Sequence, residues 1–262
     1  MRIGFHPLAV PQRWSGGWNA LLARVPSVCA VCHAWPAEPV CAACRARFAA
    51  RQPRCTGCAI VVPEGVARCG DCLLQPPPLA ACVAAISYAY PWNALIAGFK
   101  FHSQPGWARP LARLMQDAEG AQALLARADL LAPIPLARAR LAERGYNQAL
   151  LLARALAPDK TAPRLLVRVH DTPMQSRLTR ARRLRNLHDA FALHHSGQPP
   201  LAGRRVLLID DVMTTGATIF CAAAALRAAG ASEVSALVLA RTPAAQDAEV
   251  GGGADDGHGG GQ

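Results

Sequence analysis

The feature that most constrains the fold is the run VLLIDDVMTTGAT at residues 206–218. An apolar segment leads into two adjacent carboxylates, Asp210 and Asp211, and a short loop of small hydroxyl residues with one glycine follows. Such a run is typical of a buried strand that leads into a helix. At the carboxyl end of a parallel strand, the loop amides and the helix N-terminus point at one spot and favour an anion. The run therefore predicts a buried parallel strand with an anion site at its end.

The residue types in this loop indicate which anion would fit. Gly216 lets the backbone approach a phosphate closely, while Asp210 and Asp211 can accept hydrogen bonds from vicinal ribose hydroxyls or hold Mg²⁺ through water. Further hydroxyl donors are Thr214, Thr215 and Thr218. The alternative is a strand end where one Asp caps the helix, but two adjacent acids and a Thr-Thr-Gly loop exceed what a cap needs. The pattern favours a sugar with a phosphate at one end and hydroxyls along its edge.

From about residue 80 the chain alternates apolar strands with helices rich in Ala and Leu. Strands are predicted near residues 83–89, 129–134, 164–170, 205–210 and 233–240. Helices are predicted near residues 92–99, 107–127, 137–157, 179–188 and 216–229. This alternation indicates an α/β fold in which helices cover both faces of a parallel sheet. We expect that domain over residues 80–242, a small cysteine-rich domain over 26–75, and a disordered Gly-rich tail over 243–262.

Eight of the ten cysteines lie in four Cys-x-x-Cys pairs in the small domain. The pairs are Cys29/Cys32, Cys41/Cys44, Cys55/Cys58 and Cys69/Cys72. Two thiolates in a tight turn can reach one zinc ion at about 2.3 Å, so four pairs provide two tetrahedral four-thiolate sites. A disulfide framework belongs to oxidising compartments, and redox chemistry does not need four such pairs in series. With no open coordination position, both zinc ions are expected to be structural and to supply folding free energy.

The spacing alone leaves open how the four pairs share the two ions. Short gaps within the first two and within the last two pairs favour sequential sites, whereas an interleaved arrangement would join the first pair to the third. The remaining cysteines, Cys82 in an apolar strand and Cys221 in an Ala-rich helix, are expected to be ordinary buried thiols.

The charge balance is strongly basic, with 28 Lys and Arg against 17 Asp and Glu and a formal net charge of +11. This excess favours anionic partners such as phosphates, nucleotides and nucleic acid. The uncharged stretch at residues 79–99 is long enough to test as a membrane span, but Pro91 and polar residues interrupt it, so a strand and a helix fit better. No signal-peptide pattern follows Met1. We therefore expect a soluble, cytoplasmic protein with no membrane partner.

The run at residues 206–218 resembles the phosphoribosyl pyrophosphate (PRPP) signature of type I phosphoribosyltransferases. Over about residues 26–242 the chain resembles the competence protein F family (ComF, GntX-like), cytoplasmic proteins linked to natural transformation and the use of imported DNA. Besides the cysteine pairs, the resemblance rests on Phe99-Lys100-Phe101, Pro133-Ile134-Pro135, Arg144-Gly145-Tyr146-Asn147-Gln148, Thr172-Pro173, Gln175, Leu178, Arg183, Asn186 and Ala190-Phe191. It implies a type I phosphoribosyltransferase-like (Rossmann-like) α/β core joined to a small N-terminal double zinc ribbon.

The resemblance also implies roles for the matching positions. Asp210 and Asp211 would bind the ribose hydroxyls, and the loop after 133–135 corresponds to the place that holds pyrophosphate. The 5′-phosphate would be bound by Met213, Thr214, Thr215, Gly216, Ala217 and Thr218. The cofactor that accompanies PRPP would be Mg²⁺.

Basic contacts with the bound anion have several candidates. Arg144 is favoured over Arg138 and Arg140 because Gly145 follows it, which suits a shaped loop; a solvated basic helix face is the alternative for all three. Lys100, between two phenylalanines, is a further candidate for a ligand contact.

A second basic feature is the Arg-rich segment at residues 171–191. Residues 133–191 together hold eleven Arg and one Lys against four acids. In phosphoribosyltransferases the matching region is a flexible loop that closes over the reacting sugar and excludes water. A charged solvent face is one alternative, and contact with nucleic-acid phosphates is another, although only Tyr146 and Phe191 are near enough in sequence to stack on bases.

Three functions follow from these features. The leading hypothesis is binding of PRPP or a phosphoribosyl nucleotide with Mg²⁺, with transfer of the phosphoribosyl group to a nitrogen nucleophile if the protein is an active enzyme. The second is a non-enzymatic adaptor in DNA uptake that contacts single-stranded DNA or a helicase-like competence protein. The third is a nucleotide-sensing regulator that kept the site and lost turnover. Fold alone does not decide among them.

Overall fold

The computed structural model describes residues 27–168, 191–193 and 201–243. The chain divides into two compact units, Met1–Cys44 and Arg45–Gln262, and each is described by itself. The predicted helix near 179–188, the Arg-rich segment before residue 191 and the tail after residue 243 lie outside the described residues. None of the helices in the described part of the chain is both long and apolar enough to span a bilayer.

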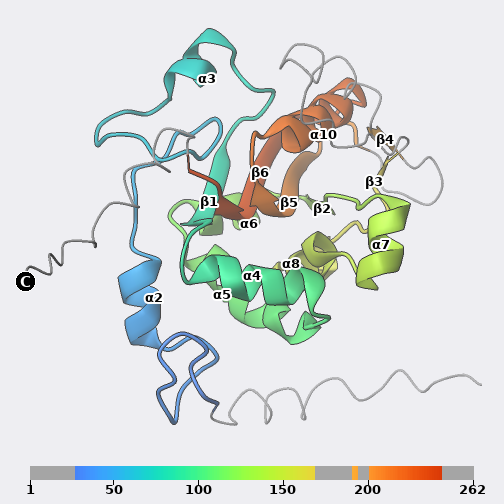
Figure 1. Ribbon diagram of the computed structural model, residues 1–262. Coiled ribbons are helices and arrows are strands. Elements are labelled where there is room, and N and C mark those ends of the chain that lie inside the picture. The colour runs from blue at the N-terminus through green and yellow to red at the C-terminus, as the bar shows by residue number, and fades with distance from the viewer. Residues whose placement is uncertain (1–26, 169–190, 194–200, 244–262) are drawn as a thin grey trace, which may run out of the picture. The chain divides into compact units, whose positions relative to one another are not determined.

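The second unit is built on a parallel sheet of four strands, which confirms the predicted α/β fold (Figure 1). The strands, in their order across the sheet, are β1 (Cys82–Ser87), β6 (Glu233–Arg241), β5 (Arg205–Met213) and β2 (Leu130–Pro133). All three neighbouring pairs are parallel. The two central strands are buried over almost their whole length because helices and loops cover both of their faces.

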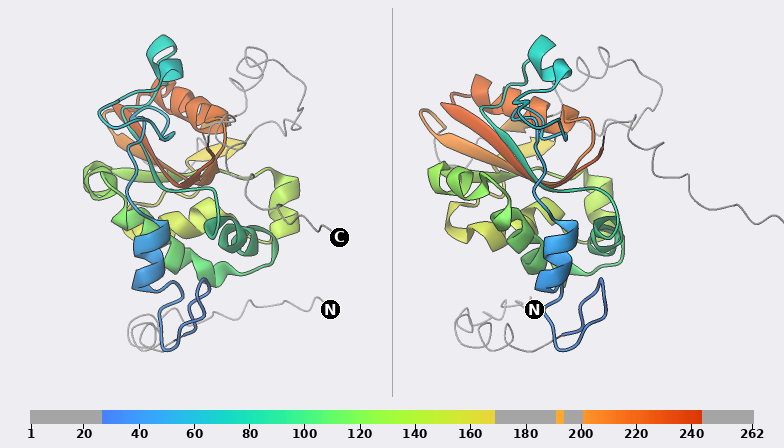
Figure 2. Two further views of the ribbon diagram at one scale, coloured as in Figure 1. Left: turned by 60° about the vertical axis from the view of Figure 1, so that its left-hand side comes forward. Right: turned by 90° about the vertical axis from the view of Figure 1, so that its left-hand side faces the viewer.

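Helices cover the sheet on both sides (Figure 2). On one face lies α10 (Ala217–Ala228), which packs on β5 and β6. On the other face α5 (Ala108–Asp117) and α8 (Gln148–Leu156) pack on the strands. Beside them lie α4 (Trp92–Phe101) and α6 (Ala121–Arg127). The shorter elements are α2 (Ala42–Phe48), α3 (Gly70–Leu74), η1 (Pro105–Trp107), α7 (Arg138–Arg144) and η2 (Pro158–Lys160).

The predictions of single helices at 107–127 and 137–157 are wrong, because each of these segments forms two helices in the structure. Gly120 has a φ of +80° and separates α5 from α6. Gly145 has a φ of +77° and ends α7, and Asn147 then caps α8 by accepting a hydrogen bond from the amide of Leu150. A glycine in the left-handed region ends a helix at little steric cost, while apolar periodicity continues through it.

The strand predicted near 164–170 does not join the parallel sheet. Its counterpart β3 (Leu166–Arg168) pairs antiparallel with β4 (Phe191–Leu193) in a separate two-stranded sheet. It has three residues, of which only Leu166 is fully buried, and a strand inside the sheet would need to bury both faces. The strand predicted at 205–210 instead continues to Met213, so both acids of the run lie inside β5.

The second group of four cysteines is part of the same hydrophobic core as the sheet. Cys55, Cys58 and Cys72 are buried in one cluster with residues of α10, including Ile219 and Ala222. The amide of Cys82, at the start of β1, donates to the carbonyl of Thr56 at 2.8 Å. The segment that holds the second group of cysteines therefore shares one hydrophobic core with the sheet and α10.

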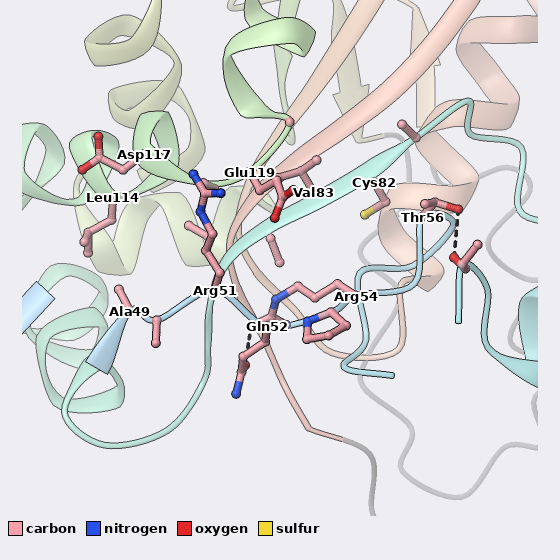
Figure 3. A pocket seen from close by; sticks show the side chains of 18 of the residues that line it. Ala49, Arg51, Gln52, Arg54, Thr56, Cys82, Val83, Leu114, Asp117 and Glu119 are labelled. Atoms are coloured by element: carbon pink, nitrogen blue, oxygen red, sulfur yellow. Dashed lines mark hydrogen bonds between the residues drawn. The ribbon is translucent and has the colours of Figure 1, made fainter. Parts of the chain in front are cut away.

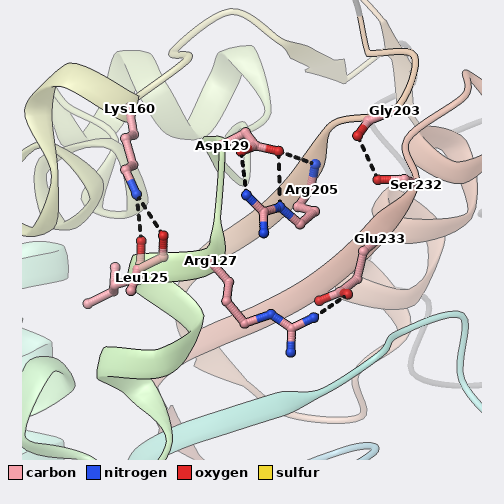
Figure 4. Close-up of polar contacts among 9 residues, drawn as sticks. Leu125, Arg127, Asp129, Lys160, Gly203, Arg205, Ser232 and Glu233 are labelled. Atoms are coloured by element: carbon pink, nitrogen blue, oxygen red, sulfur yellow. Dashed lines mark hydrogen bonds and ion pairs between the residues drawn. The ribbon is translucent and has the colours of Figure 1, made fainter.

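Polar contacts hold the amino ends of the strands together, at the edge opposite to the predicted ligand loop (Figure 4). The carboxylate of Asp129 accepts hydrogen bonds from the amide, Nε and Nη2 of Arg205 at 2.9, 3.2 and 2.8 Å. Arg127 and Glu233 form a second ion pair at 2.8 Å. The hydrogen bonds from Arg205 hold the pKa of Asp129 below its usual range.

We expect Asp129→Asn to lower the melting temperature at pH 7, and the difference from wild type to shrink as the pH falls below about 4. The folded-state pKa of Asp129 is lower than the unfolded one, so its contribution is present above the unfolded pKa and is lost as the pH falls toward the folded value. Thermal unfolding at several pH values measures this. Asp159→Asn, at an exposed acid, is the control that should follow wild type throughout. A pH-independent difference for Asp129→Asn would contradict the assignment.

Candidate functional site

The two acids of the predicted ligand site lie near the carboxyl end of β5, in the centre of the sheet. Asp211 is buried, and Asp210 is partly exposed. The amide of Asp211 donates to Oδ1 of Asp210 at 2.8 Å. Lys100, in the last turn of α4, places its Nζ 2.9 Å from Oδ1 of Asp211. The structure therefore brings Lys100 to the acid pair, which the sequence proposed only as one candidate contact.

The surroundings of the acid pair disfavour a negative charge on Asp210. Desolvation of its carboxylate, reinforced by the neighbouring charge of Asp211, raises the pKa of Asp210 to about 7, and the amide of Asp211 and the charge of Lys100 lower it only in part. A further cation or hydrogen-bond donor beside Asp210 would favour its ionised form. Two adjacent carboxylates are also the hard oxygen donors that Mg²⁺ prefers, so the residues present fit that ion.

The loop after β5 has the geometry of an anion-binding turn. Gly216 has a φ of +82° and is the N-cap of α10, a helix of 12 residues. Thr214 and Thr215 are exposed, and Oγ1 of Thr215 accepts a hydrogen bond from the amide of Ala217 at 3.4 Å. The side chain of Met213 points into the core, since it is 1% exposed, and only its backbone can serve a ligand. Amides and hydroxyls are thus available at a helix N-terminus.

The segments that carried the family resemblance converge on this edge of the sheet. Nδ2 of Asn147 donates to the carbonyl of Ile134 at 2.9 Å, and the amide of Ile134 donates to the carbonyl of Ile209 in β5 at 3.0 Å. The hydroxyl of Tyr146 donates to the carbonyl of Phe99 at 2.5 Å, next to Lys100. The strand-end loop at 133–135, the turn before α8 and the end of α4 are therefore held together around the acid pair.

Arg144 lies on this connected surface but makes no hydrogen bond or ion pair with Asp210 or Asp211 among the described residues. Its guanidinium carbon is 4.8 Å from the ring centre of Phe101, and Nη1 donates to Oε1 of Gln148 at 3.3 Å. Its Nε is buried and has no hydrogen-bond partner in the described part of the chain, so one donor remains for a ligand. Arg138 and Arg140 are exposed on α7.

Both cysteine groups have the geometry of four-thiolate metal sites, and the sequential arrangement is confirmed. In each group the four Sγ atoms lie within 4.8 Å of one another. The Sγ–Sγ distances are 3.9 Å for Cys29–Cys44, 3.7 Å for Cys32–Cys41 and 3.6 Å for Cys58–Cys69. A tetrahedron with bonds of about 2.3 Å has edges of about 3.8 Å, so both groups could hold zinc. Cys82 and Cys221 are buried thiols outside these groups, as predicted.

The electrostatics of the thiols fit a metal centre. Burial opposes ionisation of Cys29, but backbone amides, that of Cys41 first, lower its pKa to about 6. In the same way the pKa of Cys55 falls to about 7, with the amide of Cys69 as the first donor. Burial and the neighbouring thiols raise the pKa of Cys44 to about 12. Backbone amides thus favour the thiolates of Cys29 and Cys55, whereas the thiolate of Cys44 needs a cation beside it.

A separate cavity of about 660 Å³ lies along β1, on the side away from β6 (Figure 3). Arg51 and Glu119 line it, together with residues 81–85 of the β1 segment. None of the residues predicted for the phosphoribosyl site lines this cavity. The residues predicted for the phosphoribosyl site lie instead at the carboxyl edge of the sheet.

Two residues near the loop were missed by the sequence analysis. Arg241 is buried at the end of β6 and donates to carbonyls of the loop, and Thr242 donates to the same carbonyls. The sequence feature that could have identified Arg241 is its position at the end of a mostly apolar strand. A charged side chain at such a position needs a specific partner.

Comparison with known proteins agrees with this geometry. Residues 152–251 match the family described as phosphoribosyl transferase domain. Competence protein F of Haemophilus influenzae is 36% identical over 196 residues, which are 72% of this chain and 85% of that protein. DNA utilization protein YhgH of Salmonella typhimurium is 31% identical over 231 residues, 83% of this chain and 98% of that protein. Competence protein ComFC of Bacillus subtilis is 38% identical over 114 residues, 43% of this chain and 45% of that protein.

Two of these relatives match over most of the chain, and the residues that match the phosphoribosyl transferase domain include the acid pair and the two central strands of the sheet. Two groups of four cysteines precede that sheet in the sequence. The chain is therefore a member of the competence protein F family, with a phosphoribosyltransferase-type α/β domain.

Proposed function

We propose that this protein binds PRPP or a phosphoribosyl nucleotide together with Mg²⁺ at the carboxyl edge of the sheet. The observation that carries the proposal is the position of Asp210 and Asp211 at the end of a central strand, directly before a loop with Gly216 at the N-terminus of α10. The loop suits a phosphate, and the acids suit the ribose hydroxyls that lie beside it. A ligand of this kind implies that the protein acts on nucleotides or their precursors in the cytoplasm.

Each part of the ligand has a matching group. Amides of the loop and the hydroxyls of Thr214 and Thr215 would bind the 5′-phosphate. Asp210 and Asp211 would accept hydrogen bonds from the ribose hydroxyls and hold Mg²⁺, whose charge neutralises pyrophosphate oxygens. Lys100 would hold the carboxylate of Asp211 in place through their ion pair and add positive charge near the sugar. The loop at 133–135 and the free Nε of Arg144 would face the pyrophosphate.

If the protein turns its ligand over, the reaction is transfer of the phosphoribosyl group to a nitrogen nucleophile with departure of pyrophosphate. The bond from the anomeric carbon to the pyrophosphate oxygen breaks, and a bond from that carbon to nitrogen forms. Charge develops on the sugar and on the leaving group, so positioning and electrostatic stabilisation matter more than a nucleophilic side chain. Lys100 and Arg144 are two cations on this surface that suit the leaving group.

A second function is favoured by the names of the relatives together with the charge of the chain. Relatives are named competence protein F and DNA utilization protein, and this chain has a formal net charge of +11. A role as an adaptor that contacts single-stranded DNA or a helicase-like competence protein would use that charge and needs no turnover. In that case the phosphoribosyl site would act as a nucleotide sensor or be unused.

Calorimetric titration of the purified protein separates these functions. We expect PRPP to bind in the presence of Mg²⁺ and more weakly without it, and single-stranded DNA to compete poorly if it binds elsewhere. DNA affinity should fall steeply with salt, whereas PRPP affinity should depend mainly on Mg²⁺. DNA binding without PRPP binding would favour the adaptor. Binding of PRPP without release of pyrophosphate in the presence of any base would favour the sensor.

A further inference from the structure

Arg241 lies between the second cysteine group and the loop at residues 214–216 that follows β5, here called the ligand loop. It is 6% exposed, yet none of the ion pairs found among the described residues includes it. Its Nε donates to the carbonyl of Cys58, a member of the second cysteine group, at 2.9 Å. A buried cation without a counter-ion is costly, so its carbonyl partners must compensate it.

On the other side, Arg241 holds the start of the ligand loop. Its Nη1 donates to the carbonyl of Thr214 and lies 3.3 Å from the carbonyl of Met213. Thr242 adds to this, because its amide donates to the Met213 carbonyl at 3.1 Å and its hydroxyl to the Thr214 carbonyl at 3.3 Å. One guanidinium therefore joins the cysteine group to the loop.

These contacts determine where the loop amides point. In a planar trans peptide the carbonyl and the following N–H point in opposite directions. Because the carbonyls of Met213 and Thr214 are turned toward Arg241, the amides of Thr214 and Thr215 are turned away from it, toward the outer side of the loop. This is the orientation in which two N–H groups can bind one phosphate.

The positive charge of Arg241 and its neighbour Arg54 favours the same anionic ligand. Arg54 and Arg241 are close enough for their positive charges to repel each other. Arg54 donates to the carbonyl of Ala59 at 3.0 Å, next to the Cys58 carbonyl that Arg241 holds. An anion on the outer side of the loop would reduce the repulsion between these two guanidinium groups.

We propose that Arg241 is a positioning residue that couples the second cysteine group to the ligand loop, so that metal in Cys55, Cys58, Cys69 and Cys72 strengthens binding of the phosphoribosyl ligand. The proposal rests on the proposed function of the loop. Metal fixes the Cys58 segment, the Cys58 carbonyl fixes the guanidinium, and the guanidinium fixes the amides. The first cysteine group belongs to the other unit, Met1–Cys44.

The first test is Arg241→Lys, titrated with PRPP and Mg²⁺. A lysine has a single ammonium group and cannot hold the Cys58 carbonyl and the loop carbonyls at once. We expect at least a tenfold loss of affinity, with the zinc content unchanged. Arg205→Lys is the control at the opposite edge of the same sheet and should bind PRPP like wild type. Wild-type affinity in Arg241→Lys would overturn the proposal.

The second test asks whether the metal acts through Arg241. Cys69→Ser and Cys32→Ser each remove the most exposed thiol of one group, and binding is measured at a low temperature where each variant keeps the wild-type circular dichroism. We expect Cys69→Ser to weaken PRPP binding and Cys32→Ser not to. Combining Cys69→Ser with Arg241→Lys should add little to the larger single effect. Equal effects of the two cysteine variants, or full additivity, would contradict the coupling.

Hydrogen exchange at the amides of residues 214–218 keeps the test independent of the ligand. Arg241→Lys and Cys69→Ser should speed exchange there, while Cys32→Ser and Arg205→Lys should not. If wild type binds no phosphoribosyl ligand but this exchange pattern is found, the coupling stands and the proposed function fails. If wild type binds PRPP and the loop exchanges equally in all variants, the proposed function stands and the coupling fails.

Discussion

Replacing Cys55 by serine is expected to lower the melting temperature of the α/β unit by roughly ten degrees or more, whereas Cys29→Ser leaves that transition in place. Cys55 is fully buried, and its group shares one hydrophobic core with β1, β6 and α10. A structural zinc site contributes several kcal/mol or more, which is a large share of a domain's total stability of about 5–15 kcal/mol. At about 2–4 °C per kcal/mol, the shift should be easy to measure.

Cys29 is the matched control because it is equally buried but belongs to the unit Met1–Cys44. Each variant should lose about one of two zinc ions per chain, measured by atomic absorption together with calorimetry of unfolding. Equal melting of the α/β unit in both variants would show that the second group does not support the sheet. Protein purified without chelators that holds disulfides and no metal would contradict both sites.

Gly216→Ala is expected to weaken PRPP binding at least tenfold, because this glycine meets two separate constraints. Its φ of +82° is costly for a residue with a Cβ, by about 1–2 kcal/mol. A Cβ there would also lie 2.5 Å from Cε of Met213 and 2.7 Å from the ring of Phe220, so these two side chains would have to move. The loop amides at the start of α10 would then no longer point toward the phosphate site.

Gly203→Ala is the matched control for the backbone cost alone. Gly203 has a φ of +72°, and a Cβ there would meet no atom within 4 Å. Both variants should lose stability in thermal unfolding, but only Gly216→Ala should lose PRPP affinity in titration. If the two variants bind PRPP equally well, the close packing around Gly216 does not shape the ligand site.

Local patterns predict the parts of this fold that depend on neighbours in sequence. The strand over 205–210, the glycine turn and the helix after it were readable because burial, turn chemistry and helix start occur within one short run. The sequential grouping of the cysteines followed from the short gaps within each half. Both features need no knowledge of how distant segments pack.

Contacts between distant segments were not readable in the same way. No local pattern shows that the end of α4 brings Lys100 to Asp211, or that Arg241 connects Cys58 to the loop, since each contact depends on how strands and helices are arranged in space. The strand at 166–168 was assigned to the wrong sheet for the same reason, because its partner at 191–193 follows only after a long intervening segment. Apolar periodicity also continued through Gly120 and Gly145, where the backbone turns.

The most direct test of the proposed phosphoribosyl site compares wild type with the double variant Asp210→Asn and Asp211→Asn in titrations with PRPP and Mg²⁺. The substitutions keep side-chain shape and remove the charges that accept ribose hydroxyls or hold Mg²⁺. We expect PRPP affinity to fall more than about tenfold, about 1.4 kcal/mol or more, with affinity for single-stranded DNA unchanged or slightly raised. PRPP binding that is the same in both proteins would contradict a phosphoribosyl site at the end of β5.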